Sequence, residues 1–240
     1  MYFADPKGDK GSLSYIKSVP YWHRPAGAFL EVIQKTKKEG LSNPTKLAGK
    51  YMELYTASLF GMGFEVAMNT RCWLTKPSND PPDCVFMSLS GEDTKKIYFN
   101  SREAEVTRYL GNKELLETIT NKDKDKAYPP DYVLTCFFEP TGSINLKALS
   151  ESLQGKLHHI GHVFLIGHGI VSDVQPIASE IGTRVSIIQL VPQYNVTTFA
   201  ISQYFEDIKG DNRKLVYVEG RSVCYGLRDG DTEYPKLITE

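Results

Sequence analysis

Three short apolar runs limit the fold of this chain more than any other feature of its sequence. Tyr132–Phe138 is apolar on both faces of a strand, His162–Ile166 reads as another buried strand and Val185–Leu190 reads as a strand. Strands of this kind are covered on both sides, as in a mixed sheet flanked by helices. Stretches with helical periodicity alternate with these runs, so the sequence predicts an α/β fold with a central mixed β-sheet between helices.

The rest of the chain adds helices and strands to this pattern. Predicted helices cover Pro25–Gly40, a segment from the N-cap Asn43 to Gly61–Gly63, Gly111–Thr120, Leu146–His158 and Asp173–Ile181. Predicted strands cover Phe64–Trp73, Cys84–Leu89 and Lys96–Tyr109, with a hairpin of Leu215–Val218 and Val223–Leu227. The charged run 121–126 is interpreted as a solvated loop, and 197–208 fits either element.

Composition and charge set the broad class. The chain has 240 residues with 28 Lys+Arg against 29 Asp+Glu, the balance of a soluble globular protein. We expect a loosely held segment 1–20, an α/β core over 21–191 and a C-terminal addition over 192–240. No export signal and no apolar run of about 20 residues is visible, which predicts a cytoplasmic protein without a membrane partner.

Acidic side chains gather in the predicted strands after residue 82. Asp83 opens one strand, while Glu103, Glu105 and Thr107 alternate along the next and therefore share one face. A hairpin between the two strands would bring the carboxylates together, where they must bind a cation or repel one another. Oxygen ligands favour Mg²⁺, or Mn²⁺ in its place, over zinc.

These residues also carry a family resemblance. The segment Gly49–Phe64 with Glu53, then Pro82-Asp83, then Glu103-Ala-Glu105-Val-Thr107, resembles the PD-(D/E)xK nuclease superfamily, which contains most restriction endonucleases. The order also matches, since in that fold a helix with a Glu precedes a strand, the Asp begins the next strand and the (D/E)-x-K triplet follows on its neighbour. With the later strands, the resemblance covers roughly residues 43–191 and implies a restriction-endonuclease-like fold.

The third motif departs from the family pattern because no Lys stands two positions after either glutamate. With Glu103 as the acidic residue the triplet is Glu-x-Glu, and with Glu105 it becomes Glu-x-Thr. The first register implies that Asp83 and Glu103 hold Mg²⁺ while Glu105 orients or deprotonates the water nucleophile. The resemblance makes Glu53 an outer carboxylate that helps to hold the metal or its water shell.

The implied activity is Mg²⁺-dependent hydrolysis of DNA by an endonuclease, with a type II restriction enzyme as the expected role and a homodimer as the expected assembly. A formal charge of −1 leaves contact with DNA to local lysines, for which Lys46, Lys50 and Lys113 are the candidates. The alternatives are a catalytically silent nucleic-acid-binding or assembly module on the same fold, an RNA-cleaving nuclease, and a structural α/β protein.

Each candidate residue also has a purely structural interpretation. Glu53 fits a solvated position opposite the apolar stripe of its helix. Asp83 follows two prolines and fits a turn. Glu103 and Glu105 fit the solvated face of an edge strand.

Overall fold

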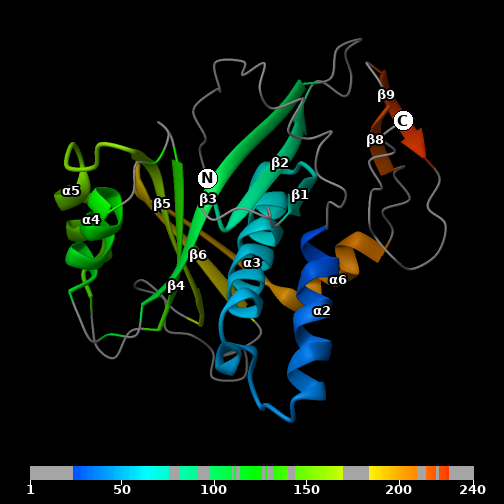
Figure 1. The fold of residues 1–240 in the computed structure, drawn as a ribbon, viewed down its shortest axis with the longest axis horizontal. Helices are drawn as coiled ribbons and strands as arrows, with labels where there is room; N and C mark the ends of the chain where they lie inside the picture. The colour runs from blue at the N-terminus through cyan, green and yellow to red at the C-terminus, as the bar shows by residue number, and fades with distance from the viewer. Residues whose placement is uncertain are drawn as a thin grey trace.

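A mixed seven-stranded sheet in the order β1-β2-β3-β4-β5-β6-β7 forms the centre of the protein (Figure 1). The computed structural model describes residues 24–75, 82–90, 98–109, 111, 114–125, 128, 132–139, 144–169, 184–209, 215–219 and 222–226. The strands are β1 (Cys72–Thr75), β2 (Cys84–Ser90), β3 (Tyr98–Tyr109), β4 (Tyr132–Phe138), β5 (Ile160–His168), β6 (Arg184–Val191) and β7 (Asn195–Ala200). Neighbours are parallel from β3 to β5 and antiparallel elsewhere.

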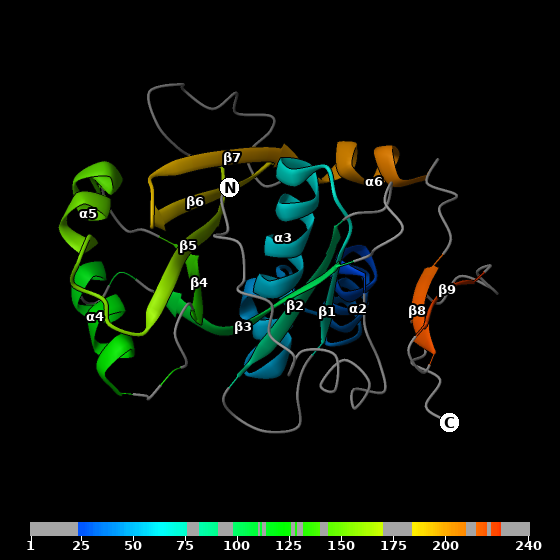
Figure 2. The same ribbon diagram turned by 90° about the horizontal axis from the view of Figure 1, so that it is seen from above.

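Helices cover both faces of this sheet, which confirms the predicted α/β class (Figures 1 and 2). On one face lie α4 (Leu115–Asp125) and α5 (Leu146–Leu153). On the other lie α2 (Pro25–Lys38), the 3₁₀ turn η1 (Pro44–Lys46) and α3 (Lys50–Met68), and α6 (Ile201–Lys209) packs on that side through Tyr204. Within the described residues, none of the helices is both long and apolar enough to span a bilayer.

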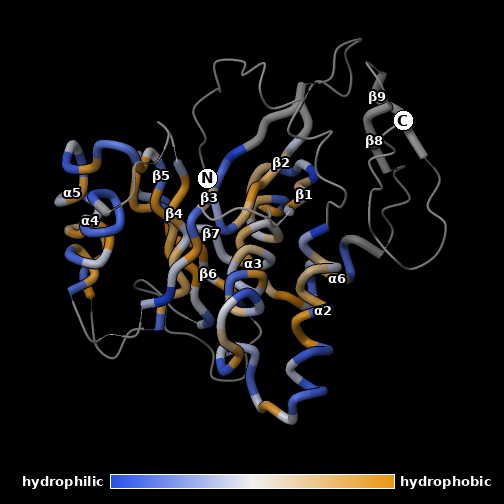
Figure 3. Tube along the Cα trace, in the orientation of Figure 1, coloured by the Kyte–Doolittle hydropathy of each residue, from blue (hydrophilic) through white to orange (hydrophobic). Residues whose placement is uncertain are grey.

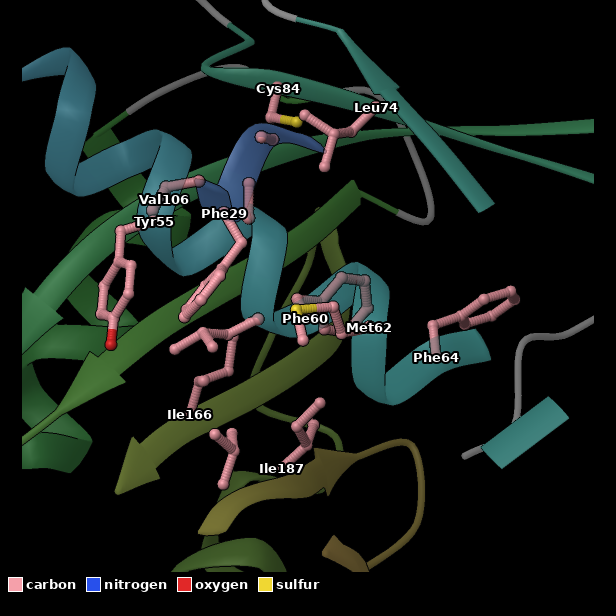
Figure 4. Packing of buried hydrophobic residues seen from close by; sticks show 14 of the residues in the cluster. Phe29, Tyr55, Phe60, Met62, Phe64, Leu74, Cys84, Val106, Ile166 and Ile187 are labelled. Atoms are coloured by element: carbon pink, nitrogen blue, oxygen red, sulfur yellow. The ribbon is translucent and has the colours of Figure 1, made fainter. Parts of the chain in front are cut away.

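The described residues form two hydrophobic cores, one on each face of the sheet. The core under α3 contains Tyr55, Phe60 and Met62 packed on the strands, together with Val106 of β3 (Figure 4). The core under α4 and α5 is formed by Leu115 and Ile119 together with side chains of β4, β5 and β6. Hydrophobic residues accordingly concentrate in the strands and in the upper part of α3, while the end of α2 is hydrophilic (Figure 3).

The second helix does not stop at Gly61–Gly63, and this prediction was wrong. Helix α3 continues to Met68, so only the last residues of the predicted strand Phe64–Trp73 are extended. The glycines are there for close packing: a Cβ on Gly61 would lie 2.7 Å from Cγ of Pro25, and one on Gly63 would lie 2.0 Å from Cδ1 of Ile187. The sequence pattern suggested that these glycines end the helix. They are explained instead by the close approach of α3 to α2 and β6.

The interpretation of the charged run 121–126 as a solvated loop was also wrong, because residues 121–125 form the last turns of α4. Helix α5 ends at Leu153, earlier than predicted, and the ambiguous stretch divides into β7 and α6. The C-terminal hairpin is confirmed as β8 (Leu215–Glu219) paired antiparallel with β9 (Ser222–Gly226). The segment 1–20 and the predicted helix 173–181 lie outside the described residues.

Candidate functional site: a carboxylate group beside Lys122

The β2–β3 hairpin brings Asp83 next to the glutamates of β3. The strands pair with Cys84 opposite Ala104 and Val85 opposite Glu103, so the position just before β2 lies level with Glu105. Asp83 stands at that position, and its Oδ2 accepts a hydrogen bond of 2.8 Å from the backbone N–H of Val106. The carboxylate thus continues the hydrogen bonding of β3 at the point where β2 begins.

Glu103 and Glu105 face the α4 layer. Their neighbours Ala104 and Val106 are buried in the core under α3, and side chains alternate along a strand, so the glutamates project to the opposite side. Glu103 is half-buried, and Glu105 is only 2% exposed. A carboxylate buried to this degree needs a partner of opposite charge or several hydrogen-bond donors.

Lys122 of α4 is that partner. Its Nζ donates a hydrogen bond of 2.8 Å to Oε1 of Glu105, and the carboxylate side of this ion pair is almost fully buried. Sequence reasoning missed Lys122 because it ended the helix too early. Extending the helical spacing from Leu115 and Ile119 by one turn places Lys122 on the inward stripe, which is the signal that would have found it.

The end of α4 is held in place by Asp123, the residue after Lys122. The two oxygens of Asp123 accept backbone hydrogen bonds of 2.8, 2.9 and 2.8 Å from His158, His159 and Ile160, at the start of β5. Three donors aimed at one buried carboxylate fix the last turn of the helix against the sheet. This anchoring positions the Lys122 side chain over Glu105.

Tyr132 of β4 borders the same group. The parallel register sets Ala104 beside Val133, so Tyr132 is the neighbour of Glu103, and its side chain belongs to the core under α4. Burial raises the pKa of Tyr132, and the negative charges of Glu105, Glu103 and Asp83 raise it further. One phenol hydroxyl therefore lies within electrostatic reach of all three carboxylates.

The donor chemistry suits a hard cation, but the carboxylates do not form a closed metal cage. Within the described ranges, no set of three or more His, Cys, Asp and Glu side chains is close enough to hold an ion. Asp83 is bonded to a backbone amide and Glu105 to Lys122. The carboxylate oxygens are of the type that Mg²⁺ prefers as ligands, and a buried hydroxyl lies among the same residues. To bind the ion, Asp83 and Glu105 must give up their hydrogen bonds to the backbone and to Lys122.

The other predicted site residues lie elsewhere. Glu53 is half-buried on α3, in the layer on the opposite face of the sheet from Glu105. Lys50 begins α3 and lies over the ring of Tyr51, while Lys46 of η1 bonds to Oγ of Ser42 at 3.0 Å. Lys113 falls outside the described residues. The structure thus brings Asp83, Glu103 and Glu105 together and leaves Glu53, Lys46 and Lys50 with α3.

A scan against protein-family models and searches of curated proteins and of solved structures gave no match to this chain.

Proposed function

We propose that the protein is a Mg²⁺-dependent endonuclease that hydrolyses phosphodiester bonds of DNA, in the manner of a type II restriction enzyme. The observation that carries this proposal is the buried ion pair between Glu105 and Lys122, set beside Asp83 and Glu103. Metal-assisted hydrolysis needs ligands that hold the cation and a group that activates the water. Two of the carboxylates can hold the cation, and Glu105 with Lys122 can activate the water. The fold places them on one side of the sheet.

Each residue has a distinct role in this proposal. Asp83 and Glu103 hold the cation, and Glu105 accepts the proton of the attacking water. Lys122 orients the Glu105 carboxylate and adds a positive charge near the phosphate that is attacked. Mg²⁺, when bound, polarises the phosphoryl group and lowers the pKa of the water.

The order of the elements supports the same proposal. Helix α3, strand β1, the hairpin of β2 and β3, helix α4 and the parallel strand β4 follow one another along the chain. The family resemblance implies a helix, then a strand, then the Asp at the start of the next strand and the acidic triplet on its neighbour. In this proposal Lys122 of α4, which bonds to Glu105 across the face of the sheet, takes the part of the lysine that the triplet lacks.

The second candidate is a catalytically silent nucleic-acid-binding module. It is favoured by the engagement of Asp83 and Glu105 with protein groups and by the lack of a closed metal cage among the described residues. This alternative requires binding of nucleic acid without cleavage in any divalent cation.

Cleavage assays separate the two candidates. Purified protein is incubated with plasmid and phage DNA, and separately with a structured RNA, in Mg²⁺, Mn²⁺ or EDTA. We expect discrete DNA fragments that need the cation and disappear in Asp83→Asn, which keeps the size of the side chain but weakens a cation ligand. Retention of DNA in a gel shift without cleavage supports the silent module, and cleavage of the RNA alone moves the proposal to that substrate.

Lys122→Met tests the lysine separately. The variant keeps an unbranched side chain but removes the charge, so we expect cleavage to fall at least about 100-fold, the scale of losing one electrostatic contact to the transition state. Lys124→Met is the matched control, since Lys124 is exposed on the same helix. Circular dichroism must show both variants folded. Equal activity of the two variants would contradict a catalytic role for Lys122.

A further inference from the structure

The hydroxyl of Tyr132 is a buried donor without a hydrogen bond. The residue is only 2% exposed, and within the part of the chain that the structure describes its Oη has no hydrogen-bond partner. Buried polar atoms in native proteins are nearly always paired, so an orphaned hydroxyl calls for a specific reason. A group that binds here and is absent from the protein alone would provide one.

The ring of Tyr132 is held rigidly. It stacks on Tyr128 with the centroids 4.3 Å apart and the planes 22° from parallel, and it is packed in the core under α4. A tyrosine ring has few rotamers, and packing on this scale leaves its hydroxyl in one place. The donor therefore cannot swing away to find another acceptor.

Tyr132 itself borders the carboxylate group. Tyr132 is next to Glu103 across the β3–β4 pair, and both side chains are on the α4 side of the sheet. A tyrosine hydroxyl is protonated at neutral pH, so it offers one donor to whatever lies in front of it. The neighbouring carboxylates are acceptors, but within the described residues none of them accepts a hydrogen bond from Tyr132.

We propose that the Tyr132 hydroxyl is a ligand-binding group of this site, which donates a hydrogen bond to an oxygen atom that arrives with the ligand. This inference rests on the proposed function and adds a residue to it. The oxygen belongs either to the phosphodiester or to water that enters with the divalent cation. In both cases the bond forms only in the loaded protein.

Tyr132→Phe tests the proposal because it removes the hydroxyl and leaves the ring. The melting temperature of the unloaded variant should equal or exceed that of the wild type, since no hydrogen bond is lost and a buried polar atom is removed. Tyr109→Phe is the matched control, because Tyr109 is a buried tyrosine in the same core and is the last residue of β3. Affinity is measured by calorimetry for Mn²⁺ alone and for duplex DNA in Ca²⁺.

We expect at least one of these affinities to fall roughly tenfold or more in Tyr132→Phe and neither in Tyr109→Phe, on the scale of one hydrogen bond to a charged partner. A weaker affinity for Mn²⁺ assigns the bond to water that enters with the cation. A loss confined to the duplex assigns it to a phosphate oxygen.

Two results overturn the proposal while the proposed function stands. One is unchanged affinity of Tyr132→Phe for both ligands. The other is a melting temperature that falls further than in Tyr109→Phe, because the hydroxyl would then be bonded inside the unloaded protein. Wild-type protein that binds neither Mn²⁺ nor duplex DNA overturns both proposals together.

Discussion

Asp123 shows how one buried side chain positions the catalytic candidate beside it. It is 2% exposed and accepts three backbone hydrogen bonds from the segment that leads into β5. Desolvation by itself raises the pKa of Asp123, but the three N–H donors outweigh it and hold the pKa below its ordinary value. The carboxylate is therefore charged over the whole physiological range, and α4 is tied to the sheet at the turn that carries Lys122.

Asp123→Asn should cost about 2–3 kcal/mol of unfolding free energy at pH 7, because charged hydrogen bonds are replaced by neutral ones and at least one backbone donor is left unpaired. The lowered pKa of Asp123 fixes the sign of the pH dependence. Its stabilisation is complete above the unfolded-state pKa of about 3.9 and is lost as the pH falls through the lower folded-state pKa. Urea unfolding from about pH 7 down to pH 2 measures both effects.

This account would be contradicted if the unfolding free energies of the wild type and of Asp123→Asn had the same dependence on acid pH. Asn145→Ala is a useful control, because Asn145 caps α5 by accepting one hydrogen bond from the backbone N–H of Ala148 and carries no charge. It should lower stability by about 1 kcal/mol without changing the acid dependence.

At the scale of elements, the packing of α3 on the sheet depends on glycine. A helix interior normally disfavours Gly by about 1 kcal/mol relative to Ala. At Gly63 steric conflict outweighs this preference. A Cβ there would clash with Cδ1 of Ile187 and would also lie 3.0 Å from Cε1 of Phe199 and 3.1 Å from Cγ1 of Ile187. The helix can approach β6 and β7 this closely only without a side chain at that position.

Gly63→Ala should therefore destabilise the protein by about 1–3 kcal/mol, since overpacking exceeds the gain in helix propensity. Val66→Ala in the same helix is the control, because Val66 is 43% exposed and the change favours the helix. Thermal unfolding of both variants gives the comparison. An increase in stability for Gly63→Ala would show that α3 can move away from the sheet at no cost.

At the scale of the whole molecule, a buried polar cluster joins elements that are far apart in the chain. Glu65 of α3 accepts hydrogen bonds from Arg24 at 2.9 and 3.2 Å, from the hydroxyl of Tyr204 at 2.5 Å and from the backbone N–H of Cys72 at 2.8 Å. Arg24 also lies over the ring of Trp73. One carboxylate thus links the start of α2, α3, the start of β1 and α6.

Arg24→Met should cost about 3–5 kcal/mol, because it leaves the Glu65 carboxylate buried without its counter-ion. Tyr204→Phe removes one neutral donor and should cost less, about 1–2 kcal/mol. Lys35→Met, which breaks an exposed ion pair with Glu39, should change little. Equal losses for Arg24→Met and Lys35→Met in urea unfolding would refute the role of the cluster.

Net charge is also a property of the whole molecule, and at −1 it gives no general attraction to DNA. Lys46 of η1 and Lys50 at the start of α3 are both exposed. If both touch phosphates, Lys46→Glu with Lys50→Glu should lower duplex affinity and reduce the slope of log K against log salt by about 2. Lys147→Glu with Lys156→Glu, two exposed lysines elsewhere, is the control for charge alone, and an identical effect would exclude a specific contact.

The sequence by itself determined the central strands β2 to β6, the α/β class and the facing of the acidic residues. These follow from local regularities, because a period of two residues places Glu103 and Glu105 on one face and doubly apolar runs such as Tyr132–Phe138 require cover on both sides. The same local rules misjudged Gly61 and Gly63, since they describe a residue's own conformational preference and not the approach of another element.

Only the tertiary structure decided what surrounds the carboxylates. Lys122 reaches Glu105 because α4 crosses back over the face of β3, and Tyr132 lies beside Glu103 because β4 is parallel to β3. Glu53 is separated from them because α3 covers the other face. Side chains that meet across a sheet come from segments joined by crossovers. The face that a crossover helix covers follows from the strand order and the handedness of the crossover, and the spacing within one segment does not give the strand order.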